Sequence, residues 1–342
     1  MKVCIVTLYN SINSGSFWQA YALGIAIKKM GHEVVYLKIK RYKKAEIKRI
    51  IKRTLKFGVN GFKKQYKMHK DFKESQKKAF NIIKNNTKDF EDVDLFILGS
   101  DTIWNLESKN LENQRNVFFG GRFKNKKVIS YAASIANTSE EKLKEHNDIQ
   151  IMLKNIEDIS VRDDYTYNVV KNIVSRDITL VCDPTLLLDK SDYSSYAKRK
   201  ENDKYMFLYL FSKLSREQEE KMKLFAKQHN LKIISGYDEI NYNDKCIANS
   251  PDEFLNYMYY ADYIITDTFH GTVFSVNLRK QFVSINRNKK KVNDFLDKCD
   301  LNDRLIDESN INKLEEVIDY KKTEECLSVF KKASIDYLKK YL

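Results

Sequence analysis

The stretch ADYIITDTFHGTVFSVNL, residues 261–278, shows most clearly how this chain folds. Residues 261–265 form an apolar run that is typical of a buried strand, and residues 273–278 continue as the apolar face of a helix. Polar and small residues stand between the two, where a strand would end and a helix begin: Asp267, Thr268, His270, Gly271 and Thr272. Ligands of α/β proteins bind at the carboxyl ends of parallel strands, so these residues are candidates for a functional site.

The same alternation of apolar runs and helical periods recurs along the chain. Strands are predicted at residues 2–8, 32–38, 93–98, 127–131, 158–161, 178–182, 205–211, 232–235, 262–266 and 281–285. Helices are predicted at residues 17–30, 140–154, 163–171, 215–229 and 251–260, and after Gly271. Strands that alternate with helices form parallel sheets joined by right-handed crossovers. The predicted fold class is therefore α/β, with two doubly wound, Rossmann-like domains that face a cleft.

The length of 342 residues indicates two domains, because a single hydrophobic core usually stops growing below that size. Asp183-Pro184 ends the last strand of the first series, since proline cannot donate the next ladder hydrogen bond. The predicted boundaries are 1–188 for the first domain, with a basic helical insertion at 39–90, then 203–310 for the second domain and 311–342 for a helical tail.

The net charge of +14 is concentrated in one segment. Residues 38–88 hold 19 Lys or Arg and three acids, a net charge of +16, which leaves −2 for the rest of the chain. Apolar residues recur at helical spacing inside this segment: Ile47, Ile50, Ile51 and Leu55. An apolar stripe flanked by lysines is typical of a helix that lies on an anionic membrane surface. The alternative is that the stripe packs on the first domain and the lysines face water. Nucleic acid is not expected as a partner.

The remaining composition points to a cytoplasmic protein without a metal site. No apolar run approaches the roughly 20 residues of a spanning helix, and the N-terminus does not resemble a signal peptide. The five cysteines are dispersed and lack C-x-x-C spacing, so neither disulfides nor zinc are predicted.

Polar residues also follow predicted strands of the first domain. Gly15 and Ser16 open a helix, where they could bind an anion or simply form a turn and helix cap. Ser100 and Asp101 end the third strand, and Asp101 is a candidate to bind sugar hydroxyls or to act as an acid or base. Two neighbours could contact a sugar, although capping and core packing would equally explain them: Trp104 and Asn105.

Arg162 and Asp163 follow a further buried strand. Arginine there could grip a phosphate or a carboxylate with two hydrogen bonds. Asp183, at the end of the next strand, is a further candidate to bind the substrate. The alternative is a structural pair between Arg162 and Asp163 or Asp183, with Asp163 as a helix cap. His270 could donate a proton or bind phosphate, because histidine titrates near neutral pH.

Six motifs, in order, carry a family resemblance: NSINSGSFWQAYAL, ILGSDTIWN, SYAAS, SVRDD, CDPTLLL and ADYIITDTFHGTVFS. Together they resemble the polysaccharide pyruvyltransferase family from about residue 3 to residue 304. The resemblance implies an architecture similar to the B-type glycosyltransferases. It also implies transfer of pyruvate from phosphoenolpyruvate to a sugar of a cell-surface polysaccharide or its precursor, with a pyruvate ketal as product and no cofactor.

The resemblance also implies roles for individual residues. It places Arg162 and His270 on the donor phosphoenolpyruvate. We expect His270 to be the acid, and Asp101 or Asp163 to be the base for the sugar hydroxyl. A lipid-linked acceptor would place the enzyme on the inner face of the membrane. The alternative function is a B-type glycosyltransferase that uses a nucleotide sugar, because one fold supports several chemistries.

Overall fold

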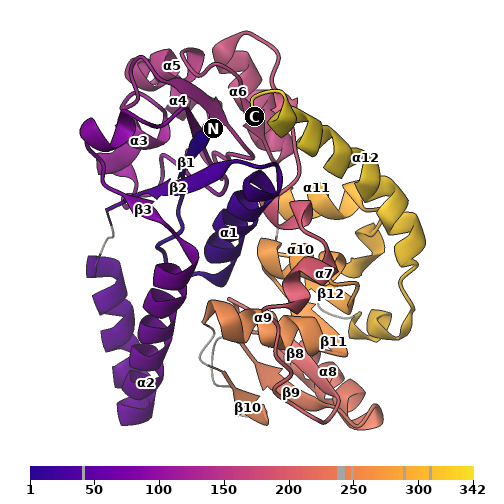
Figure 1. The fold of residues 1–342 in the computed structure, drawn as a ribbon. Coiled ribbons are helices and arrows are strands. Elements are labelled where there is room, and N and C mark those ends of the chain that lie inside the picture. The colour runs from indigo at the N-terminus through magenta and orange to yellow at the C-terminus, as the bar shows by residue number, and fades with distance from the viewer. Residues whose placement is uncertain (41–42, 237–242, 248–249, 288–289, 308–309) are drawn as a thin grey trace. The chain divides into compact units, whose positions relative to one another are not determined.

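The computed structural model covers residues 1–342 and describes all of them except 41–42, 237–242, 248–249, 288–289 and 308–309 (Figure 1). Within helix α2 it also leaves undescribed the side chains of residues 43–46, 48–50, 52–53 and 56–57. The chain divides into two compact units. The first comprises Met1–Phe62, Lys73–Leu187 and Phe330–Leu342, and the second Lys63–Phe72 and Leu188–Val329.

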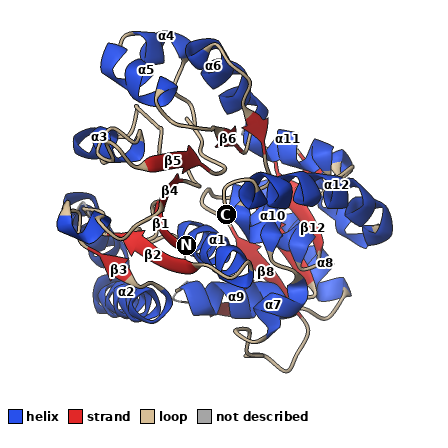
Figure 2. Cartoon of the chain, turned by 45° about the horizontal axis from the view of Figure 1, so that its top comes forward, coloured by secondary structure: helices blue, strands red, loops and turns tan. Residues whose placement is uncertain are grey.

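The first unit is built on a parallel five-stranded sheet in the order β3-β2-β1-β4-β5, whose strands lie side by side in Figure 2. Its strands are β1 (Lys2–Val6), β2 (Glu33–Leu37), β3 (Ile82–Ile83), β4 (Leu95–Leu98) and β5 (Lys127–Ser130), with a separate pair β6 (Ser160–Val161) and β7 (Thr179–Leu180). Its helices are α1 (Ser14–Lys29), α3 (Arg115–Phe118), α4 (Glu140–Lys144), α5 (Asn147–Lys154) and α6 (Asp164–Val174), with short 3₁₀ turns η1 (Lys88–Phe90), η2 (Glu112–Gln114) and η3 (Pro184–Leu187). Helix α2 (Lys43–Ala79) is shared, since its residues Lys63–Phe72 belong to the second unit.

The second unit has a parallel six-stranded sheet in the order β10-β9-β8-β11-β12-β13. Its strands are β8 (Tyr205–Tyr209), β9 (Lys232–Ser235), β10 (Lys245–Cys246), β11 (Tyr263–Thr266), β12 (Gln281–Ile285) and β13 (Leu305–Ile306). Its helices are α7 (Lys190–Ser194), α8 (Arg216–Gln228), α9 (Pro251–Tyr260), α10 (Phe269–Asn277) and α11 (Lys290–Lys298), followed by α12 (Tyr320–Lys339). Buried strand residues such as Leu208, Ile265 and Val283 pack with Phe225 of α8 in one core.

The predicted elements match the observed ones closely where an apolar run has sharp polar limits. The bounds of β9, α9 and β12 are those predicted from the sequence. The predicted helix 140–154 is instead two helices, because His146, with φ −109° and ψ 82°, leaves the helical region between α4 and α5. The α/β fold class with parallel sheets is confirmed.

The C-terminal helix α12 is not a separate tail. Its last residues belong to the first unit, where the Ser334 hydroxyl accepts a hydrogen bond from the Cys182 backbone N–H at 2.8 Å. The Tyr337 hydroxyl donates to the Ser130 carbonyl at 2.9 Å. Both contacts are buried, so the end of the chain is part of the first unit's core.

Helix α2 carries the basic segment and breaks at Gly58, where φ is 60° and ψ is −149°. After the break, one face is buried through Gln65, Met68 and Phe72. Before the break, Ile47, Ile51 and Leu55 are 52%, 53% and 82% exposed, so these residues do not form the packed stripe of the alternative prediction. The side chain of Ile50 lies outside the described residues. Within the described part of the chain, no helix combines the length and apolar character needed to cross a bilayer.

Candidate active site

Asp101 follows the carboxyl end of β4 and lies at the centre of a polar cluster in the first unit. Its backbone has a φ of 74°, an uncommon value for a residue with a side chain. One carboxylate oxygen, Oδ2, accepts from the Ser16 hydroxyl at 2.5 Å, and the other, Oδ1, accepts from the Thr102 N–H at 2.8 Å. The side chain is 10% exposed. Hydrogen bonds therefore hold the Asp101 carboxylate in place, while a small part of its side chain stays accessible to solvent.

Arg162 joins Asp101 to a second carboxylate. Its Nη1 lies 2.9 Å from Oδ2 of Asp183, and its Nη2 lies 3.4 Å from Oδ1 of Asp101. Burial alone would lower the pKa of Arg162, but the charges of Asp183, Asp101 and Asp163 outweigh it and hold the pKa above its ordinary value. The Arg162 side chain is only 1% exposed and its charge is compensated. This arrangement matches the structural pair with Asp183 that the sequence left open.

Asp163 and Asp183 both have structural roles here. Asp163 caps α6, because its side chain accepts from the Thr166 N–H at 2.8 Å. The second oxygen of Asp183 accepts from the N–H and hydroxyl of Thr185. Of the aspartates predicted to act in the first unit, Asp101 is therefore the best placed to meet a substrate.

The turn before Asp101 is built by buried polar contacts. The Ser100 hydroxyl donates to Oε1 of Gln19 at 2.6 Å, and its carbonyl accepts from the Thr7 hydroxyl at 2.8 Å. A Cβ on Gly99 would lie 2.3 Å from the Tyr131 carbonyl oxygen, so glycine is required by the packing of the backbone. Thr7 and Gln19 were not among the residues predicted for the site. The available signal was a polar residue inside an otherwise apolar strand and helix.

Other candidates of the first unit support the local structure. Trp104 is fully buried, donates from Nε1 to the Phe118 carbonyl and stacks on Phe119. Its ring therefore cannot contact a sugar as predicted. The Asn105 side chain accepts from the Glu107 N–H. The N–H groups of Gly15 and Ser16 donate to the Asn13 side chain, which caps α1.

In the second unit, the start of α10 is shaped by threonines. The Thr268 hydroxyl caps the helix by accepting from the Gly271 N–H at 2.9 Å. A Cβ on Gly271 would lie 2.1 Å from Oγ1 of Thr266, so glycine is needed here to leave space for the Thr266 side chain. The Thr272 hydroxyl contacts Ser284 on β12 at 2.8 Å.

Asp267 and His270 differ in how they face solvent. Asp267 is buried, and its two oxygens accept from the N–H groups of Phe211 and Ser212 at 2.8 and 2.9 Å, which fixes the connection after β8. His270 is partly exposed in the first turn of α10, where the helix dipole favours an anion. Of the five candidates on this stretch, His270 is the only one that is not buried. It is therefore the candidate on this stretch with the most accessible surface, although its ring Nε2 is itself buried.

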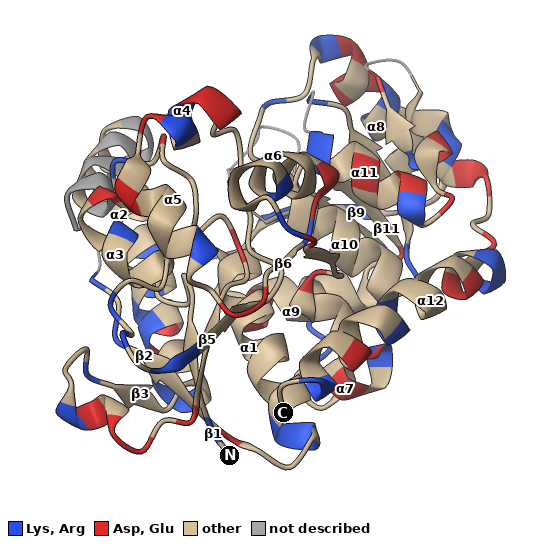
Figure 3. Cartoon of the chain, turned by 90° about the horizontal axis from the view of Figure 1, so that it is seen from above, with Lys and Arg blue, Asp and Glu red and all other residues tan. Residues whose placement is uncertain are grey.

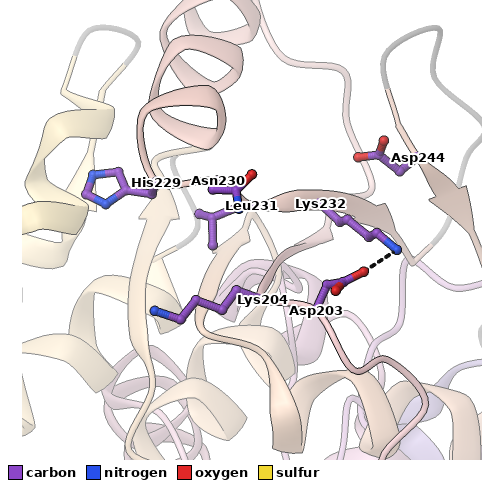
Figure 4. Close-up of a pocket in the computed structure, with 7 residues that line it drawn as sticks. All are labelled: Asp203, Lys204, His229, Asn230, Leu231, Lys232 and Asp244. Carbon is purple, nitrogen blue, oxygen red and sulfur yellow. Dashed lines mark ion pairs between the residues drawn. The ribbon is translucent and has the colours of Figure 1, made fainter.

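The second unit also contains a cavity of about 690 Å³, shown in Figure 4. It lies at the opposite edge of the sheet, because Lys204 and Leu231 directly precede β8 and β9. An ion pair between Lys232 and Asp203, 2.6 Å long, compensates charges within its lining. It contains none of the predicted site residues. Within the described ranges, no group of three His, Cys, Asp or Glu is arranged to hold a metal ion.

Solved structures define the class of protein to which this fold belongs. A protein of Listeria monocytogenes described as a UDP-N-acetylglucosamine 2-epimerase is similar, with 9% identity, coverage of 98% of this chain and 94% of that one, and a TM-score of 0.59. A UDP-GlcNAc 2-epimerase of Methanocaldococcus jannaschii has 9% identity, coverage of 97% and 93%, and a TM-score of 0.51. At such low identity the likeness concerns the fold alone. The fold is the two-domain, Rossmann-like architecture of the B-type glycosyltransferases.

Within that class the family is identified by the sequence. The model of the polysaccharide pyruvyl transferase family matches residues 13–289, most of the chain. The chain belongs to this family. No curated protein matches it closely enough in sequence to count as a relative.

Proposed function

We propose that this protein transfers pyruvate from phosphoenolpyruvate to two hydroxyls of a sugar in a cell-surface polysaccharide or its precursor. The observation that carries the proposal is the family match over residues 13–289. The partly exposed His270 at a helix start and the small accessible part of Asp101 at a strand end support it, because both lie where α/β folds bind ligands.

The proposed chemistry begins with a proton that moves to the methylene carbon of phosphoenolpyruvate. The neighbouring carbon becomes oxocarbenium-like, and one sugar hydroxyl attacks it and loses its proton. The bond between that carbon and the phosphate oxygen then breaks, and a second hydroxyl closes the ketal. Of the two hydroxyl protons released, one balances the proton taken up by the new methyl group and the other leaves with phosphate.

We assign the acid and the phosphate contact to His270 and the hydroxyl base to Asp101. Asp101 is preferred to Asp163, whose carboxylate caps α6. Arg162 lies between two carboxylates, so we propose that it holds Asp101 in position. Its direct contact with phosphoenolpyruvate stays a prediction from the family resemblance.

Thermal shifts test the choice of donor. Phosphoenolpyruvate should raise the melting temperature of the protein, and a His270→Ala variant should lose most of that rise because the phosphate contact is gone. The control is Thr272→Ser, which keeps the hydroxyl that contacts Ser284. Stabilisation by uridine or guanosine diphosphate, without any effect of phosphoenolpyruvate, would instead favour a nucleotide-sugar glycosyltransferase.

We also propose that the first half of α2 attaches the protein to an anionic membrane surface, as a lipid-linked acceptor would require. Residues 43–57, before the break at Gly58, contain seven Lys or Arg and a single acid, Glu46. On α4, α11 and α12, by contrast, charges of both signs are interspersed (Figure 3). The exposed Ile47, Ile51 and Leu55 would enter the interface, and each cation near it contributes about 1 kcal/mol.

Co-sedimentation with vesicles tests this attachment. Binding should increase with the fraction of phosphatidylglycerol, fall with added salt, and weaken in an Ile51→Ser, Leu55→Ser double variant. Val329→Ser is the matched control, since Val329 is an exposed apolar residue on α12. Binding that is indifferent to lipid charge and to salt would contradict the proposal.

A further inference from the structure

A second cavity, of about 410 Å³, lies in the first unit where β2 and β3 end. Its lining comprises three cations, three amides and two apolar side chains: Lys38, Lys40, Arg122, Asn85, Asn113, Gln114, Ile39 and Val117. No carboxylate is among these residues, so the lining carries three positive charges that it does not itself compensate. The volume is within the usual range for a small-molecule site.

The turn that carries the two lysines is held in place by amide side chains. Gln114 is buried, and its Oε1 accepts from the Lys40 N–H at 2.8 Å while its Nε2 donates to the Lys40 carbonyl at 3.2 Å. The Asn10 side chain donates to the Ile39 carbonyl at 2.8 Å. Because the backbone is fixed on both sides, the lysines project from a preformed edge of the cavity.

Arg122 is oriented in a similar way. Its Nε donates to Oδ1 of Asn85 at 3.2 Å, and its guanidinium carbon lies 5.6 Å from the centre of the Phe90 ring. Among the described residues this pairing uses Nε, which leaves the two Nη groups for a ligand. Two parallel N–H groups of arginine fit the two oxygens of a carboxylate or phosphate.

We propose that this cavity binds an acidic group, phosphate or carboxylate, of the glycan acceptor. The cations would hold the acidic group, and the side chain of Asn113, which can both donate and accept, would bind neighbouring sugar hydroxyls. The position at the carboxyl end of parallel strands is where α/β folds place ligands. Helix α2, the proposed membrane helix, begins at Lys43, three residues after Lys40 of the lining. An acceptor held at the membrane by its lipid carrier would therefore present its phosphate near Lys40. The inference rests on the proposed function.

Calorimetric titration with three probes tests the proposal: inorganic pyrophosphate, methyl β-glucuronide and the neutral methyl β-glucoside. At least one acidic probe should bind 10-fold or more tightly than the glucoside. Binding of pyrophosphate points to a carrier phosphate, and binding of the glucuronide points to a uronic acid in the glycan. Failure of both acidic probes to bind would overturn the proposal.

Variants locate the binding. A Lys38→Gln, Arg122→Gln double variant should bind the acidic probe at least 10-fold more weakly. Arg122→Lys should give a smaller loss of affinity, because lysine keeps the positive charge but lacks the two parallel N–H groups of arginine. Lys154→Gln, an exposed residue outside the cavity, should bind like the wild type. Equal binding by the double variant, or competition between phosphoenolpyruvate and the acidic probe, would overturn the assignment. Phosphoenolpyruvate binding is measured separately, so loss of this inference leaves the proposed donor untouched.

Discussion

Removing the charge of Arg162 should destabilise the first unit strongly. The side chains of Arg162 and Asp183 are 1% and 0% exposed and lie 2.9 Å apart, and Asp101 approaches the same guanidinium at 3.4 Å. In Arg162→Gln, two carboxylates keep their buried positions without a compensating cation. Breaking a buried ion pair from one side costs about 3–5 kcal/mol. Each kcal/mol lowers the melting temperature of a domain of 150–250 residues by about 2–4 °C, so the expected shift is about 6–20 °C.

Tryptophan fluorescence measures this shift in the first unit alone. The chain has two tryptophans, Trp18 and Trp104, and both are buried in that unit. The shift should shrink as the pH falls from 7 towards 5, because an uncompensated buried carboxylate can be relieved by protonation. Lys144→Gln, which breaks an exposed pair with Glu140, is the control and should melt like the wild type. An Arg162→Gln protein that melts within 2 °C of the wild type at pH 7 would refute the assigned role.

Three further predictions concern the second unit. Gly271→Ala should destabilise it by about 1–3 kcal/mol, since the added Cβ would lie 2.1 Å from Oγ1 of Thr266, and urea unfolding followed by far-UV circular dichroism would detect this. Thr268→Ala should cost about 1 kcal/mol through loss of the α10 cap, seen as faster amide exchange in α10; unchanged exchange would contradict the capping role. Burial, with the nearby charge of Lys190, lowers the pKa of Lys280 to about 8, below its unfolded value, so its unfavourable contribution at neutral pH should fade as the pH rises above 8. Between pH 8 and 9.5, the free energy of unfolding of the wild type should therefore rise relative to that of Lys280→Met. Parallel pH profiles of the two proteins would contradict the lowered pKa of Lys280.

Local sequence was sufficient to predict which parts of the chain form the sheets. Strands such as Lys232–Ser235 and Gln281–Ile285 are short apolar runs with polar limits, and both are observed as predicted. The strand-end position of Asp101 and His270 followed from the same periodicity. The ends of the units were harder to predict, because Tyr337 reaches Ser130 across 207 residues and no local pattern indicates such a contact.

Roles within the site were less predictable than positions. Asp267 looked like a ligand for substrate, yet its carboxylate fixes Phe211 and Ser212, more than 50 residues earlier in the chain. Gly271 was a candidate for the functional site, but it makes room for the Thr266 side chain. The partners of Asp267 come close only through the three-dimensional register, whereas Thr266 is five residues from Gly271 and its packing depends on the tight turn between β11 and α10.

The most direct test of the central claim is NMR of a reaction with phosphoenolpyruvate labelled with carbon-13 at the carbon that bears the phosphate, together with a panel of glycan acceptors. The proposed function predicts a new ketal carbon and one inorganic phosphate for each ketal formed. Asp101→Asn and His270→Ala should slow the reaction at least 100-fold, because each removes a proposed acid or base. Phosphate release without a ketal carbon, or no reaction with any acceptor and no binding of phosphoenolpyruvate, would contradict it.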